Sequence, residues 1–381
     1  MYTESSEENK LLQNTVRKFV EEQVIPVASA FEEREEFPQE LVAQLAKLGL
    51  MGMIVPQQYG GAGASAVSHT IVAEELARGW ASLHIIFSAN NSLACEPILR
   101  YGDEGQKRRY LTPMAQGKAL GCYSLTEPEV GSDAAALATQ ARLAGDKWEL
   151  SGTKMFITNA AEANICVVFA RTGGERHKGI SAFVFDTEAP PLVHPGVSVR
   201  KISKMGLKSS SFCEINFDNC LLPQDSLLGE LGEGFKVAMT TLDGGRINIA
   251  SQAVGIARAA FEESLSYAQA RTQFGQAIFD FQAIKFMLTN MATGIEAARA
   301  LTLKAAALKD QGLPFTKEAS QAKLFASEMA VQATVDAIRI LGGYGYTREF
   351  RVERYLRDAM ATVIYEGTSQ IQNLVIARHL A

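Results

Sequence analysis

The spacing of hydrophobic residues changes twice along this chain of 381 residues, so a fold built on one repeating pattern is excluded. Up to about residue 118, apolar residues recur every three or four positions, as they do along one face of a helix. From about 119 to 225, short runs rich in strand-forming residues alternate with turns that contain glycine, and after about 226 the helical spacing returns. We therefore expect an α+β protein of three parts, in the order helical, β and helical.

The first part, residues 1–118, contains two clear helical patterns. Apolar residues between positions 11 and 20 share one face of a first helix, and we expect Pro26 to end it. A second helix is expected to begin at Pro38 and to stop at Gly49. The glycine cluster at 60–63 (GGAG) has no strand signal before it, so we interpret it as a loop.

The middle part, residues 119–225, reads as a small all-β domain. Its strand-like runs are short and bounded by turns, and they lie at 147–150 (KWEL), 165–169 (ICVVF), 180–185 (ISAFVF) and 213–217 (CEINF). Several short strands of this kind predict a barrel or a sandwich.

The third part, residues 226–381, is predicted to be a helical bundle. The alanine-rich run 319–341 suits close helix packing, and Gly342 and Gly343 are expected to end it. No Gly-x-Gly-x-x-Gly pattern follows a strand and opens a helix, so the sequence does not support a Rossmann dinucleotide-binding unit.

Composition excludes several classes of partner. The net charge of -5 gives no reason to expect nucleic acid or an anionic membrane, and no apolar run reaches the length of about 20 residues that spans a bilayer. The five cysteines are scattered and the five histidines lack a His-x-x-x-His spacing, so neither disulfides nor a structural metal is expected. The acidic start lacks a signal or transit pattern, and we expect a cytoplasmic protein.

One carboxylate near the end of the chain is a candidate general base. Glu366 lies between Tyr365 and Gly367 in the run 364–372 (IYEGTSQIQ), where one helical segment passes into another. The glycine permits close backbone approach to a ligand, and the hydroxyl and amide groups that follow suit a polar cofactor. The alternative is an ordinary carboxylate at a helix entry, stabilised by the amides of the next turn.

A second candidate segment stands at the entrance to the β-region. The loop 125–133 (LTEPEVGSD) presents hydroxyls and free amides together, which suits the edge of a flavin or a pyrophosphate. A tightly capped turn would have the same composition, and the loop alone does not decide between the two.

Six motifs together resemble the acyl-CoA dehydrogenase family in order and spacing, over essentially the whole chain. They are 125–133 (LTEPEVGSD), 154–159 (KMFITN), 242–246 (LDGGR), 271–275 (RTQFG), 340–345 (ILGGYG) and 365–369 (YEGTS). The resemblance is greatest to short- or medium-chain members, similar to butyryl-CoA dehydrogenase.

This resemblance implies an FAD-dependent flavoprotein of fatty acid metabolism, with an N-terminal helical domain (1–118), a middle β-domain (119–225) and a C-terminal four-helix bundle (226–381). Such enzymes are usually homotetramers, dimers of dimers, in which a neighbouring subunit completes the FAD site. They oxidise an acyl-CoA to the trans-2-enoyl-CoA and pass the electrons to an electron-transfer flavoprotein. Burial against flavin and acyl chain is expected to raise the pKa of the base.

By the same resemblance each motif acquires expected roles. Glu366 would remove the α-proton while a hydride leaves for flavin N5, and its backbone N–H would bind the thioester carbonyl. The residues expected to bind the cofactor are Leu125, Thr126, Ser132, Phe156, Thr158, Arg271, Phe274, Arg339, Gly342, Gly343, Thr368 and Gln370. Those expected to bind the substrate are Ser132, Asp243, Arg246, His84, Glu96, Tyr365 and Gly367.

Some residues depart from the family pattern. Glu129 and Val130 would add charge and bulk near the ligand entrance, and Arg339 replaces a common glutamine. His84, with Glu96 further along the same helical region, stands where relatives that act on glutaryl-CoA carry an arginine. This pair hints at a polar or bulky acyl group, although a partly buried histidine whose ring is satisfied by its neighbours is the favoured interpretation.

Three functions are therefore compatible with the sequence. The first is dehydrogenation of a short or branched acyl-CoA. The second is dehydrogenation of a carrier-protein-bound, or of a polar, cyclic or dicarboxylic, acyl thioester. The third is a non-catalytic assembly scaffold, against which the presence of Glu366 and of the threonine in the flavin loop argues, because a scaffold needs no base.

Overall fold

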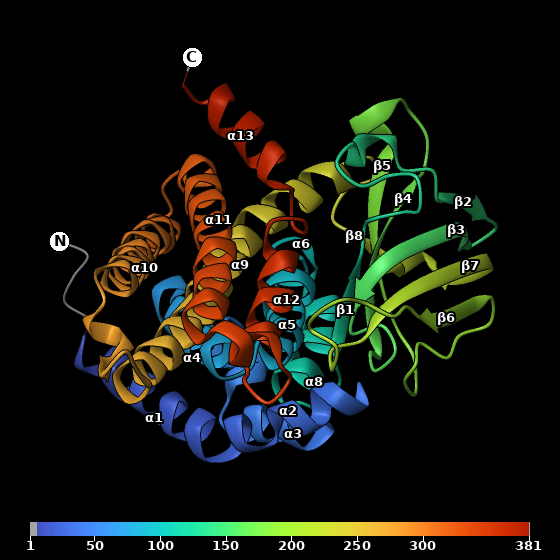
Figure 1. Cartoon of the computed structure of the whole chain (residues 1–381). Coiled ribbons are helices and arrows are strands. Elements are labelled where there is room, and N and C mark those ends of the chain that lie inside the picture. The colour runs from blue at the N-terminus through green and yellow to red at the C-terminus, as the bar shows by residue number, and fades with distance from the viewer. Residues whose placement is uncertain (1–5, 381) are drawn as a thin grey trace.

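The computed structural model describes residues 6–380 and places a β-sheet beside two groups of helices. The sheet occupies one side of the molecule, the C-terminal helices occupy the other, and N-terminal helices pack below and between them (Figure 1). The predicted α+β class and the order helical, β, helical are both confirmed. No helix among the described residues is long and apolar enough to cross a membrane.

Most of the N-terminal helices pack around a core that includes Val20, Leu45, Leu76 and Trp80. Their bounds are α1 (Glu7–Phe19), α2 (Ile25–Arg34), α3 (Gln39–Lys47), α4 (Ala66–Gly79), α5 (Ala81–Ser88), α6 (Glu96–Tyr101), α7 (Glu104–Gln106) and α8 (Thr112–Ala115). The second predicted helix is confirmed as α3, which follows Pro38 and ends before Gly49 at a φ of 75°.

The expectation that Pro26 ends the first helix is wrong. A π-helical turn, Val20–Val24, joins α1 to α2, and the Ile25 N–H bonds to the Val20 carbonyl across this wider turn. Pro26 then falls in the first turn of α2, directly after this wider turn, at a helix position where proline is commonly found. The helix therefore continues past the proline.

The middle region forms an eight-stranded sheet in the order β6-β7-β3-β2-β4-β5-β8, with β1 paired in parallel to β4. Its strands are β1 (Gly121–Ser124), β2 (Gln140–Ala144), β3 (Lys147–Thr158), β4 (Ile165–Arg171), β5 (Ile180–Asp186), β6 (Val197–Lys201), β7 (Phe212–Pro223) and β8 (Leu227–Leu228). Residues of β3 and β7 share one buried cluster with residues of β4 and β5, so the two halves of the sheet curl over a common core.

A β-bulge in the sheet bears directly on function. The register of β3 against β7 shifts between Lys154 and Ile157, and Phe156 within this shift has a φ of 66°. The bulge turns the Phe156 ring out of the sheet's core, where it stacks on Phe212 with ring centroids 5.1 Å apart. About half of the Phe156 surface is exposed.

The C-terminal helices pack through small residues. They are α9 (Gly234–Ala270), α10 (Gln282–Asp310), α11 (Thr316–Leu341), α12 (Val352–Thr362) and α13 (Ser369–Arg378), with a two-stranded ribbon of β9 (Thr272–Gln273) and β10 (Gln276–Ala277) after α9. Buried alanines of α9 and α11 lie in the same core. The division into domains at 118 and 225 stays our proposal.

The crossing of α9 over α4 depends on one glycine. A Cβ at Gly255 would lie 2.5 Å from the Glu74 carbonyl and 2.7 Å from the Ala77 Cβ. We expect Gly255→Ala to lower the free energy of unfolding by about 1–3 kcal/mol, because the helix backbones must separate. Denaturant unfolding measures the change.

Gly294→Ala is the matched control, because it also adds a methyl to a glycine within a long helix. There the nearest atom is Cγ of the flexible Met329 side chain at 2.8 Å, which can move aside. We expect Gly294→Ala to be neutral or stabilising by up to about 1 kcal/mol. Equal effects of the two substitutions would contradict the backbone-contact argument.

Candidate active site

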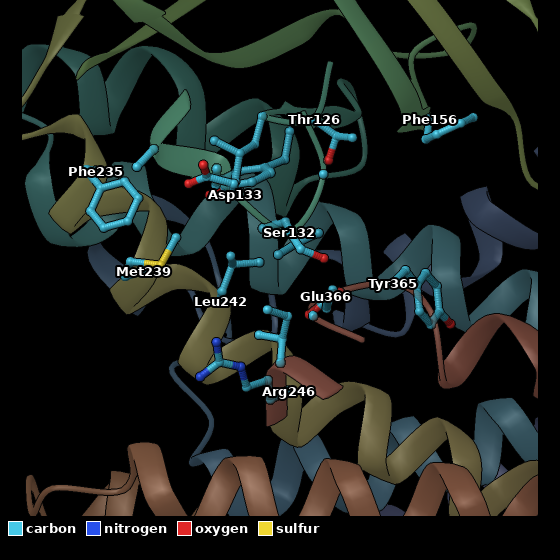
Figure 2. Close-up of a pocket in the computed structure, with 18 of the residues that line it drawn as sticks. Thr126, Ser132, Asp133, Phe156, Phe235, Met239, Leu242, Arg246, Tyr365 and Glu366 are labelled. Atoms are coloured by element: carbon cyan, nitrogen blue, oxygen red, sulfur yellow. The ribbon is translucent and has the colours of Figure 1, made fainter. Parts of the chain in front are cut away.

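A cavity of about 530 Å³ lies where the sheet, the N-terminal helices and the C-terminal helices meet. Residues from all three parts line it, and Figure 2 shows their side chains converging on one space. They include Leu125, Thr126, Ser132, Phe156, Thr158, Arg246, Tyr365, Glu366 and Gly367. The cavity therefore brings together most of the residues predicted from the loop 125–133, the segment 154–159 and the run 364–372.

The Glu366 carboxylate is the chemically distinctive group in this cavity. Both of its oxygens are buried, and within residues 6–380 neither has a hydrogen-bond partner. Burial raises the pKa of Glu366 to about 7, against the opposing charges of Lys323 and Arg246. This agrees with the expected direction and leaves the group able to gain or lose a proton near neutral pH.

Gly245 of α9 provides the space that the carboxylate occupies. A Cβ at this position would lie 2.1 Å from Glu366 Oε2 and 3.3 Å from Leu93 Cδ2. Any larger residue would therefore displace the carboxylate. From the sequence, Gly245 is expected only as part of the motif 242–246; two adjacent glycines inside a helical run are the signal of such a close contact.

The turn that carries Glu366 is held in an uncommon backbone conformation. Glu366 has a φ of 50° and Gly367 a φ of 92°, and both lie between α12 and α13. The Gln372 amide donates to the carbonyls of Glu366 (3.2 Å) and Gly367 (2.9 Å), and Lys323 Nζ donates to the Gly367 carbonyl at 2.7 Å. These bonds stabilise a left-handed conformation that glutamate rarely adopts.

Tyr365 lines the cavity beside Glu366 and is fixed by Gln252 of α9, which accepts a hydrogen bond from its hydroxyl. Arg246 lines it from the same helix, and its Nη1 donates to Asp243 at 2.6 Å. Asp243 itself does not line the cavity. Its carboxylate accepts hydrogen bonds from Arg246 and, at 2.6 Å, from Thr316 Oγ1. Asp243 therefore orients the arginine.

On the sheet side, a buried ion pair anchors the loop 125–133. Lys154 Nζ lies 2.8 Å from Glu127 Oε1 and donates to the Leu125 carbonyl at 3.1 Å. Burial favours the neutral form of Glu127. The pKa of Glu127 nevertheless lies below its usual value, because Lys154 attracts the carboxylate and the backbone N–H groups of Ala138 and Thr139 donate to it. Burial lowers the pKa of Lys154 to about 8.

With the loop 125–133 fixed in this way, some of its side chains face the cavity and are accessible to a ligand. Thr126, Ser132 and Thr158 line the cavity, and in the described chain their hydroxyls bond to no other residue. With the half-exposed Phe156 ring beside them, the donor set fits the ring and ribityl chain of FAD. The residues present are thus compatible with the expected cofactor.

Glu129 and Val130 do not crowd this entrance as expected. Val130 is buried in the core beneath the loop, because its backbone pairs with that of Glu127 in a tight turn that directs its side chain inward. Glu129 is exposed and, like Val130, does not line the cavity. The extra bulk is therefore absorbed by the core.

A second, shallower cleft gathers another predicted group. Arg271, Gly342 and Gly343 line it, and the Arg271 guanidinium lies 5.8 Å from the centre of the Tyr344 ring. Phe274 lies on the ribbon that follows Arg271 and is 94% exposed. These residues do not line the first cavity, so within one chain the two groups of residues expected to bind FAD lie apart.

Three further residues expected to contact FAD lie elsewhere. Thr368 caps α13 by accepting from the Ile371 N–H at 3.3 Å, and Gln370 is exposed. Arg339 is exposed and pairs with Asp336 at 3.2 Å. Their roles in cofactor binding stay predictions.

His84 and Glu96 do not line the main cavity. His84 is fully buried, and in the described chain neither ring nitrogen has a hydrogen-bond partner; burial lowers its pKa to about 3. Glu96 pairs with Lys309 at 3.1 Å and borders a separate, much smaller cavity together with His69. The structure therefore separates the two residues from Glu366.

Comparisons with known proteins agree with this geometry. Models of the acyl-CoA dehydrogenase N-terminal, middle and C-terminal domains match residues 6–118, 122–220 and 232–381. The chain is 48% identical over 379 residues to the mitochondrial short-chain specific acyl-CoA dehydrogenase of Bos taurus, which covers 99% of this chain and 91% of that protein.

Two solved structures are similar over the full length. Butyryl-CoA dehydrogenase from Megasphaera elsdenii matches with a TM-score of 0.96 and 39% identity, covering 100% of both chains. A structure named for an electron transferring flavoprotein of Acidaminococcus fermentans matches with a TM-score of 0.97 and 42% identity, covering 100% of this chain and 99% of that one.

A methyl group at Gly245 would occupy the space that the Glu366 carboxylate fills. We expect Gly245→Ala to displace the carboxylate toward solvent, so that its pKa falls from about 7 toward the ordinary value of a glutamate. Infrared titration of the protonated carboxyl band, assigned by its loss in Glu366→Gln, measures the midpoint.

Gly244→Ala is the control from the adjacent position. Its Cβ would meet the end of the flexible Lys309 side chain at 3.0 Å rather than Glu366. We expect the midpoint to stay at the wild-type value in this variant. A midpoint unchanged in both variants would show that Gly245 does not make room for the base.

Proposed function

Because this chain belongs to the acyl-CoA dehydrogenase family, we propose that it converts a short or branched acyl-CoA to the trans-2-enoyl-CoA, with Glu366 as the base that removes the α-proton. The family is one of FAD-dependent oxidoreductases, and FAD is the cofactor. The observation that carries the residue assignment is the buried Glu366 carboxylate, which has no partner in the described chain and a pKa near 7.

The residues around Glu366 support this task. A carboxylate without a hydrogen-bond partner is free to accept a carbon-bound proton, and burial makes it a stronger base than a hydrated one. The Glu366 backbone N–H donates to no other residue within 6–380, so it is available to the thioester carbonyl, whose oxygen becomes negative as the α-proton leaves. FAD, when bound, supplies the acceptor for the hydride from the β-carbon.

The cavity wall also suits an apolar acyl group. Ile85, Ala89 and Leu93 line the cavity with aliphatic side chains, and Leu242 of α9 lines it as well. A short acyl chain held there would exclude water from Glu366. Desolvation of this kind is what raises the pKa of the base.

The partners follow from the same proposal. We propose that the electrons pass to an electron-transfer flavoprotein, as the name of one similar structure suggests, and reduction of that protein during turnover tests this proposal.

We also propose a homotetramer, because Phe274 and Tyr346 are 94% and 89% exposed beside the second cleft. Analytical ultracentrifugation measures the mass of the assembly and so tests the homotetramer.

The five buried, unpaired cysteines fit the expected reducing cytoplasm, which cell fractionation would test.

The central test is Glu366→Gln, assayed with butyryl-CoA and a dye acceptor. The variant should keep the flavin absorbance near ~450 nm and lose turnover by about 10²–10⁴-fold, because it lacks the proton acceptor. Since the pKa of Glu366 is about 7, and only its ionised form acts as a base, kcat/KM of the wild type should rise with pH through about 7.

Glu129→Gln, an exposed carboxylate of the loop 125–133, serves as the control and should keep both flavin and turnover. Unchanged turnover in Glu366→Gln would contradict its assignment as the base. A purified protein that stays colourless with added FAD would instead favour the scaffold.

The ring of His84 is the observation that bears on a second candidate function, in which the acyl group is polar or cyclic. The two ring nitrogens of His84 lack partners in the described chain, which is costly unless something satisfies them. A site built to bond a polar group rejects analogues that lack it by large factors.

A substrate panel with dicarboxylic and cyclic acyl-CoA members, and with a loaded carrier protein, distinguishes these functions. We expect wild type and His84→Ala to show the same ranking, with butyryl-CoA among the better substrates, because His84 does not line the cavity. Loss in His84→Ala confined to polar members would instead support recognition of the acyl tail. Turnover only on the loaded carrier protein would support the carrier-bound substrate.

A further inference from the structure

A second buried charge lies against the turn that carries Glu366. Lys323 is on α11, its side chain is fully buried, and its ammonium donates to the Gly367 carbonyl at 2.7 Å. No carboxylate of the described chain lies within 4.0 Å of it. A buried ammonium without a close counter-ion is costly, so its position calls for an explanation.

The surroundings of Lys323 show that α11 acts as a support for the turn. One turn further along the helix, Ser327 Oγ donates to the Thr362 carbonyl at 3.0 Å, where α12 ends. The next residue, Glu328, accepts from Ser369 Oγ at 2.6 Å, where α13 begins. The bond from Lys323 falls between these two points, directly after Glu366.

The charges facing Glu366 come from several elements. Lys323 on α11 and Arg246 on α9 both favour its ionised form, whereas burial disfavours it. Tyr123 on β1 and Tyr365 are neutral, because burial raises the pKa of each well above its usual value. Arg246 is also bound to Asp243, which offsets part of its charge, so Lys323 is the cation without a paired carboxylate.

We propose that Lys323 is a positioning residue for the reaction: its ammonium holds the Gly367 carbonyl, so that Glu366 keeps its left-handed conformation facing Gly245, and its charge favours the ionised carboxylate. The inference rests on the proposed role of Glu366 as the base. It requires that Lys323 stay protonated where the enzyme works, and burial lowers its pKa only to about 8.

The test compares Lys323→Met, which removes the ammonium but keeps the length of the side chain, with Lys323→Arg, which keeps a charged donor. We expect the titration midpoint of the Glu366 carboxyl, followed by its infrared band in the protein without substrate, to rise in Lys323→Met and to stay near the wild-type value in Lys323→Arg. A rise of one unit lowers kcat/KM about tenfold at pH 6.

The pH profile gives a second readout that a purely structural role would not move. The deficit of Lys323→Met should close by about pH 9, where Glu366 is ionised in both proteins and the wild-type lysine has lost its own proton. A deficit of equal size at every pH, with an unchanged midpoint, overturns the proposal.

Lys317→Met is the control on the same helix, since Lys317 is partly exposed and lies beside Glu318 at 3.5 Å. It should leave both the midpoint and the profile unchanged. If Lys323→Met fails to fold, as judged by circular dichroism, Lys323→Gln replaces it, because its amide can still donate while carrying no charge. An unchanged midpoint in that variant also overturns the proposal.

The carboxyl titration needs no substrate, so it separates this inference from the proposed function. A wild type that does not oxidise acyl-CoA contradicts the function, whereas the midpoint still decides whether Lys323 supports Glu366.

Discussion

An acidic side chain buried without a hydrogen-bond partner in the described chain is the constraint on which the rest of the site depends. Glu366 must have space, and the absence of a side chain at Gly245 gives it that space. It must not be neutralised by a direct ion pair, so the cations that favour its charge act without bonding to it. It must also face the cavity, which requires a backbone conformation that the neighbouring helices hold in place.

The loop 125–133 and the turn that carries Glu366 are each held by a hydrogen bond from a buried lysine. On the sheet side, the fully buried Lys154 donates to the Leu125 carbonyl, and on the helical side the fully buried Lys323 donates to the Gly367 carbonyl. An ammonium is a strong donor on a long apolar stem, so it can reach a loop carbonyl from within a packed element. Each loop is thereby fixed to a rigid strand or helix while its cavity-facing groups stay free.

The fold could be predicted from the sequence because its signals are local. The spacing of apolar residues identified the helices and strands, and the missed continuation past Pro26 came from a π-helical turn that has no clear composition signal. Glu366 could be singled out because a glycine and two hydroxyl residues follow it directly. Lys323 and Lys154 could not, since their partners lie 44 and 27 residues away and a lysine in an amphipathic run normally indicates an exposed face.

Residues predicted to bind FAD lie in two separate places within one chain. Residues in the run 364–372 and the loop 125–133 meet because α9 passes between sheet and bundle and brings Arg246 to the same cavity. Arg271 and Gly342 meet each other at a different surface, next to exposed aromatic side chains. Within one chain, these two groups have no common ligand space, so a ligand that used both would need a second copy of the chain.

The pKa values of these groups define where the arrangement works as a unit. Below about pH 7 Glu366 holds a proton and cannot accept another, whereas above about pH 8 Lys323 and Lys154 lose the charges with which they hold the two loops. All three shifts have the same leading cause, which is burial, and burial moves an acid and a base toward each other on the pH scale. Deeper burial would therefore narrow the pH range between the pKa of Glu366 and the pKa values of the two lysines. Shallower burial would make Glu366 a weaker base. The burial that makes Glu366 an effective base thus cannot be increased far without loss of the lysine charges.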